Sequence, residues 1–134
     1  MSFQRGLITI TRAAAAEIIA DAEASDVPVF VISTAPGGGR EAFFNSVRAA
    51  LPLDPPLRSS RSWDALSDSL WEGLRVLASD AAVIVWPDAA ELKEDSPEDY
   101  EISLSILRDI AESLADPAAT SGRPKAVCIY VGGG

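Results

Sequence analysis

The sequence predicts an α/β fold built on a small parallel sheet, and two patterns lead to this prediction. Three short runs are apolar almost throughout and rich in β-branched residues, as is typical of strands covered on both faces: 27–32, 82–86 and 125–131. Between them, apolar residues recur at helical spacing in 40–51, in 62–78 and in a stretch that opens at Ser96. Because parallel strands need crossover connections, the order β-α-α-β-α-β predicts right-handed helical crossovers.

The predicted helices have recognisable ends and faces. Ser62 is a suitable N-cap for the second helix, and Ser96 and Pro97 give the third a cap and a proline at its first position. One face of the second helix is expected to be buried because four leucines share it, namely Leu66, Leu70, Leu74 and Leu77. Each helix is therefore expected to pack one apolar side on the sheet.

Residues 1–26 are predicted to be an N-terminal extension, and residues 27–134 to be the domain itself. Within the extension, 7–10 is a short β-like run, and Thr11 is a suitable cap for an alanine-rich helix over 13–24. The apolar side of this helix is thin, so we expect the extension to dock on the domain or on a second copy of the chain.

Composition excludes several classes of chemistry. With 134 residues, of which 48% are hydrophobic and 23% charged, the chain has the composition of one ordinary folded domain. It contains no histidine, which excludes a Ser-His-Asp triad, a Cys-His pair and an imidazole-ligated metal. Cys128 is the only cysteine and is expected to pack as a buried hydrophobe. No run is long and apolar enough to cross a membrane, so the expected location is the cytoplasm.

The charge is strongly acidic and unevenly distributed. The chain has 11 basic and 20 acidic residues, a net charge of −9. Residues 64–112 hold 13 acidic and 3 basic residues, whereas the rest holds 7 acidic and 8 basic ones. Such a field disfavours direct binding of nucleic acid and attracts cationic partners, although a simply solvated surface is the alternative.

One side of the second helix stands out because it gathers acids and a tryptophan. At about 100° per residue, Asp64, Asp68, Trp71 and Arg75 lie together opposite the leucines. This face should be exposed and suits a cationic partner. The alternative is a solvated face on which the N-terminal segment covers Trp71.

A glycine loop leaves an enzymatic function open. Residues 37–39 lie between a strand and a helix, where phosphate-binding loops also lie, but the Lys-Ser/Thr ending and the G-x-G-x-x-G spacing are absent. A flexible connection is therefore favoured over a nucleotide-handling enzyme that would use this loop with Asp64, Asp68 and magnesium. The acids of 95–101 are expected to offset a helix dipole, so no metal or other cofactor is predicted.

The element Asp64-Ala65-Leu66-x-Asp68-x-Leu70 resembles the barstar family, intracellular inhibitors of the ribonuclease barnase. The strand 83–86, which ends in a tryptophan, and the helix segment 104–109 support the resemblance, which covers about 27–131. The resemblance implies a barstar-like α/β fold with a three-stranded parallel sheet and no catalysis. It also implies that an acidic helix and the preceding loop enter a basic active site, where carboxylates occupy the places of substrate phosphates.

Carried over by residue, the resemblance implies Asp68 at the centre of the partner-binding surface, Asp64 as a second contact and Asp109 as a third. Ser67 and Trp71 fall at neighbouring interface positions, though their side chains differ from those of the family. Trp63 is predicted, with Trp71, to be an apolar anchor, which brings the predicted surface to six residues. One departure is that Arg58 and Arg61 stand in the predicted binding loop, where they would repel a basic active site. The resemblance predicts inhibition of a basic ribonuclease or related toxin. Because of the two arginines, a barstar-like scaffold that binds a non-nuclease protein is the alternative.

Overall fold

Four parallel strands form one sheet in the part of the chain that the computed structural model describes, residues 6–34, 36–57 and 62–133. The strands are β1 (Gly6–Ile10), β2 (Val29–Val31), β3 (Ala81–Trp86) and β4 (Ala126–Gly132), and their order across the sheet is β1-β4-β3-β2. The last strand of the sequence therefore lies inside the sheet, between the first strand and the third.

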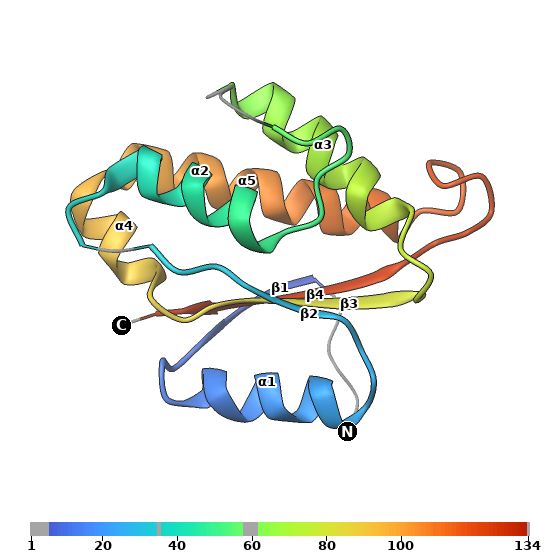
Figure 1. The fold of residues 1–134 in the computed structure, drawn as a ribbon, viewed down its shortest axis with the longest axis horizontal. Helices are drawn as coiled ribbons and strands as arrows, with labels where there is room; N and C mark the ends of the chain where they lie inside the picture. The colour runs from blue at the N-terminus through green and yellow to red at the C-terminus, as the bar shows by residue number, and fades with distance from the viewer. Residues whose placement is uncertain (1–5, 35, 58–61, 134) are drawn as a thin grey trace.

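Helices cover both faces of this sheet (Figure 1). The helices are α1 (Ala14–Ala24), α2 (Gly39–Ala50), α3 (Trp63–Arg75), α4 (Ala89–Asp95) and α5 (Pro97–Leu114). In Figure 1, α2, α3 and α5 lie on one side of the sheet and α1 lies on the other. The short α4 joins β3 to α5 and buries Ala89 and Leu92 in the same core as α2, α3 and α5.

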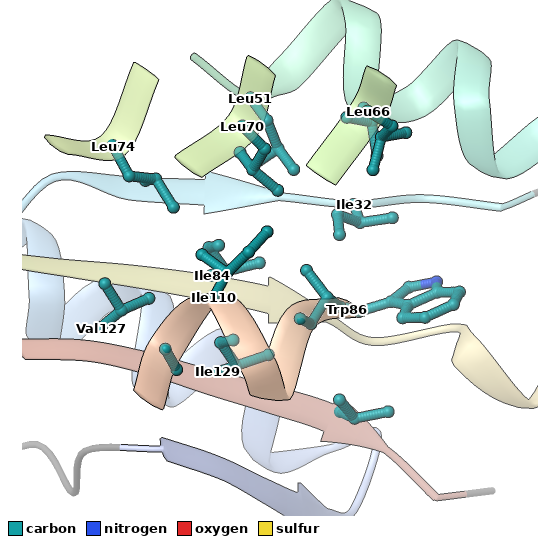
Figure 2. Packing of buried hydrophobic residues seen from close by; sticks show 14 of the residues in the cluster. Ile32, Leu51, Leu66, Leu70, Leu74, Ile84, Trp86, Ile110, Val127 and Ile129 are labelled. Atoms are coloured by element: carbon teal, nitrogen blue, oxygen red, sulfur yellow. The ribbon is translucent and has the colours of Figure 1, made fainter. Parts of the chain in front are cut away.

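The strands β3 and β4 are apolar throughout because both of their faces are buried. Alternate residues enter the larger core, among them Ile84 and Trp86 of β3 and Val127 and Ile129 of β4, where they meet leucines of α3 (Figure 2). The residues between them enter a smaller core under α1, made chiefly of Val83, Val85, Cys128 and Tyr130. The α/β class predicted from these runs is confirmed.

The expectation of three strands is wrong, because β1 adds a fourth by pairing in parallel with β4. The strand expected over 27–32 is shorter, since only Val29–Val31 form the ladder with β3. Bonding continues on either side, with Val83 N–H donating to the carbonyl of Pro28 and Ile32 N–H donating to Val85. Pro28 has no N–H to donate, which is tolerated because β2 is an edge strand.

Two helix predictions also need correction. The helix expected over 62–78 ends at Arg75, and Leu77 lies just beyond it. There the Leu77 N–H donates to the Leu74 carbonyl, three residues earlier, which closes a tighter turn before β3. The helix α4 was not expected at all, since its seven residues are too few to show a helical repeat.

The N-terminal segment belongs to the same sheet as the rest of the chain. Its strand β1 pairs with β4 over five residues, and Ala15 and Ala22 of α1 are buried against the second face. The alanines that make the apolar side of α1 thin also let this helix lie close to the sheet. The division of the chain into an extension, 1–26, and a domain, 27–134, stays a proposal. The contacts that residues 6–26 make with β4 and with the second face of the sheet cross this boundary.

Cys128 gives a direct probe of how firmly α1 covers the second face. Its side chain is buried in the smaller core, with only 2% of the residue exposed. We expect the native thiol to react with a disulfide reagent at least about 100-fold more slowly than in the urea-unfolded chain, because reaction requires local opening. The measurement is the labelling rate followed by absorbance. Native labelling as fast as in urea would show that α1 does not protect the sheet.

Candidate partner-binding site

The helix α3 is held by its apolar side, which leaves its acidic side outward. Ser62 caps its start, with the Ser62 hydroxyl accepting a hydrogen bond from Ala65 N–H at 3.3 Å. Leu66, Leu70 and Leu74 are fully buried, as the sequence predicted. On the opposite side, the Asp64 and Asp68 residues are exposed.

A groove of about 350 Å³ runs between α3 and α5. It is lined by Ser67, Asp68 and Trp71 of α3 and by Asp109, Ile110 and Ser113 of α5. Four of the six residues predicted for the partner-binding surface therefore lie around one hollow. Asp64 and Trp63 are not among the residues that line it.

The ring of Trp71 is fixed across this groove. Its indole N–H donates to the Ser113 hydroxyl oxygen at 3.0 Å, and the half-buried ring packs against the larger core. Within the described residues 6–26 the N-terminal segment does not cover Trp71, because α1 lies on the opposite face of the sheet and the ring is held by Ser113 of α5. The expectation that this whole face of α3 is exposed is therefore wrong for Trp71, which is partly buried against the larger core.

The carboxylates of Asp68 and Asp109 at the groove form no ion pair within the described residues. Ion pairs in the described part of the chain join Arg12 to Glu91 and Glu72 to Arg75, and neither involves a predicted site residue. The hydrogen bond to Arg75 is the main cause that lowers the pKa of Glu72, and the same bond raises the pKa of Arg75. That pair largely neutralises itself, so the acidic character of this surface comes from the aspartates.

Trp63 lies on a different side of α3, against α2. Its ring centroid is 4.9 Å from that of Phe44 and 5.8 Å from that of Phe43, and the Arg40 guanidinium carbon lies 4.8 Å from the ring centroid. This packing makes Trp63 a half-buried border of the core. The two arginines of the predicted binding loop, Arg58 and Arg61, lie outside the described residues.

The glycine loop is hydrogen-bonded to a carboxylate of the same chain. Gly37 N–H donates to the Asp95 carboxylate at 2.7 Å, so an amide that a phosphate would need already faces a negative charge. In the described ranges no group of three acidic or cysteine residues is arranged to hold a metal ion. Likewise, no helix among the described residues is both long enough and apolar enough to cross a membrane.

Two groove residues, Ile110 and Ser113, were not predicted from the sequence. Ser113 lies one helical turn after Asp109, so helical spacing alone places both on one face of α5. That signal was available, but only the packing of α5 against α3 shows that this face borders the groove.

Comparison with protein families gives one match. A family model described as Barstar (barnase inhibitor) matches residues 27–128, a range that contains every residue of the groove. Comparison with curated proteins and with solved structures found no match to the chain. The matched range begins two residues before β2 and ends within β4, so it excludes β1 and α1. The chain therefore belongs to the barstar (barnase inhibitor) family.

Proposed function

We propose that this protein inhibits a basic ribonuclease or a related toxin by binding over its active site. The observation that carries the proposal is the convergence of Asp68 and Asp109, from two separate helices, on one groove. A basic active site that binds substrate phosphates would accept carboxylates in their place. In this proposal the protein is an inhibitor, like the barstar (barnase inhibitor) family to which it belongs, and it is not an enzyme.

Each site residue has a stated role in the proposed complex. Asp68 is the central carboxylate, with Asp109 beside it across the groove and Asp64 one turn earlier on α3. Ser67 and Trp71 supply the polar and apolar contacts between the acids, while Trp63 borders the loop that precedes α3. The acidic field of the surface speeds association, so raised salt should mainly lower the association rate.

The proposed target is made in the same cell, so the proposed location of the inhibitor is the cytoplasm. The proposal involves no membrane and no direct contact with nucleic acid, in keeping with the net charge of −9. An inhibitor of this kind would give the cell immunity to its own toxin.

A protein partner that is not a nuclease is the second candidate. The arginines at 58 and 61 favour it, because two positive charges beside a basic active site would weaken binding. A nucleotide-handling enzyme is disfavoured by the Asp95 carboxylate on Gly37 N–H.

Capture of a partner tests the proposal. The immobilised protein is exposed to lysate of its source cells beside two variants of equal net charge, Asp64→Ala/Asp68→Ala and Glu17→Ala/Glu23→Ala. The second pair removes exposed acids from α1, on the far face of the sheet. A basic nuclease retained by the wild type and the α1 variant alone supports the proposal. Retention of a non-nuclease protein in this pattern supports the second candidate, and equal retention by all three surfaces contradicts both.

With the partner in hand, Asp68→Ala is expected to weaken the complex by about 2 kcal/mol or more, roughly 30-fold in Kd. The reason is that a partner cation buried against Asp68 would lose its counter-charge. Surface-plasmon measurements should show the change mainly as faster dissociation, with Glu17→Ala as the control. An unchanged Kd would remove Asp68 from the interface.

A further inference from the structure

A second hollow lies at the far end of α3 and shares none of its lining with the groove. It measures about 370 Å³ and lies where β3 and β4 begin, between the end of α3 and the loop that leads into β4. Its charged lining consists of Arg75, Arg123 and Lys125 with one acid, Asp80. Basic residues thus outnumber acidic ones here, in a chain whose net charge is −9.

The ammonium of Lys125 is the most informative group in this hollow. The residue is only 6% exposed, and its Nζ donates to the carbonyl oxygens of Leu77, at 2.7 Å, and Ser79. Both acceptors are neutral, and within the described chain no carboxylate lies at ion-pair distance from Lys125. A buried charge without a counter-charge is costly, which favours binding of an anion beside it.

The other lining groups favour the same kind of ligand. Arg123 lines the hollow and is exposed, and a guanidinium can donate two parallel hydrogen bonds to an oxyanion. The carbonyls that follow α3 would repel an anion, but those of Leu77 and Ser79 already accept from Lys125. Val76, 54% exposed, adds an apolar wall.

We propose that this hollow binds a phosphate group, with Lys125 and Arg123 as the main donors. Arg75 also lines the hollow, but its charge is already paired with Glu72. Its volume exceeds that of a phosphate ion, and Val76 lies within its lining. The expected ligand is therefore a small phosphate monoester whose organic part rests on Val76. This site is independent of the proposed inhibition, which uses the groove between α3 and α5.

Titration of the full chain with inorganic phosphate and with phenyl phosphate tests the proposal, at constant ionic strength and with acetate as the carboxylate control. Amide NMR signals of 76–78 and of Arg123 should shift saturably with both phosphates, and phenyl phosphate should bind more tightly. Acetate should cause no comparable shift. Acetate binding as tight as phosphate binding, or shifts no larger than those caused by sodium chloride, would overturn the site.

Three variants that each remove one charge test whether phosphate binding depends on the charges of this hollow. Arg123→Gln should weaken phosphate binding about tenfold, since one charge-assisted contact is lost. Asp80→Asn should tighten it, because the one acid of the lining loses its charge. Arg12→Gln, at the opposite end of the sheet, should leave it unchanged. All three side chains are exposed, so folding should persist where a change at Lys125 could abolish it. Equal Kd values for Arg123→Gln and Arg12→Gln would refute the assignment.

Discussion

Replacing Gly73 with alanine is expected to destabilise the protein by about 3 kcal/mol, the upper range for overpacking of a core. Helix propensity alone predicts the opposite sign, because alanine in a helix interior is favoured over glycine by about 1 kcal/mol. Gly73 is buried on the side of α3 that meets the segment after α2. A Cβ there would collide with the Pro52 carbonyl oxygen, with the carbonyl carbon only 2.5 Å away and Leu53 N at 3.1 Å.

The collision is with backbone, so no side chain can rotate to relieve it. Either α3 or the 52–53 segment must move, and each movement loosens the larger core. Urea denaturation of Gly73→Ala and wild type measures the effect, with Ser105→Ala as a control at an exposed position of α5. The control should change stability by less than about 0.5 kcal/mol. A Gly73→Ala protein as stable as wild type would show that α3 lies farther from Pro52.

Removal of residues 1–26 is expected to cost most of the folding free energy. It exposes one edge of β4 and uncovers Val83, Val85, Cys128 and Tyr130. Each large apolar side chain returned to water costs roughly 1.5–3 kcal/mol, whereas a domain is stable by only about 5–15 kcal/mol. We expect the 27–134 chain to bind a hydrophobic dye and to lose cooperative thermal unfolding.

Two full-length variants separate the packing of α1 from chain length. Ile18→Asp places a charge on the side of α1 that packs on the sheet and should destabilise the protein. Ala20→Asp introduces the same charge at an exposed position of α1 and should not. If the 27–134 chain unfolds at the same urea concentration as the full chain, the second face is stable without α1 and the division at 26/27 is a true domain boundary.

The sequence predicted the strands well where both faces of the sheet are buried. A run such as 82–86 is apolar at every position, and no other structure of that length explains it as simply. The position of β1 was not predictable in the same way, because its pairing with β4 joins residues more than a hundred positions apart. Nor was α4, whose place depends on Leu92 entering a core formed by other elements.

The site was predictable only in part, for a related reason. Helical spacing places Asp64, Asp68 and Trp71 on one side of α3, and this much was read from the sequence. The spacing carries no information about what lies opposite. The groove exists because α5 packs beside α3, and the bond from Trp71 to Ser113 fixes the ring across it.

The strand order β1-β4-β3-β2 also sets the time at which the fold can be completed during synthesis. Of the four strands, β1 is synthesised first, and it pairs with β4, which is synthesised last. Until residues 126–132 have emerged, β1 lacks its partner and β3 has one open edge. The nascent chain therefore exposes the β1 edge for most of the time between the first strand and the last, and an edge of β3 as well once residues 81–86 have emerged. Binding by a chaperone in this state would prevent aggregation.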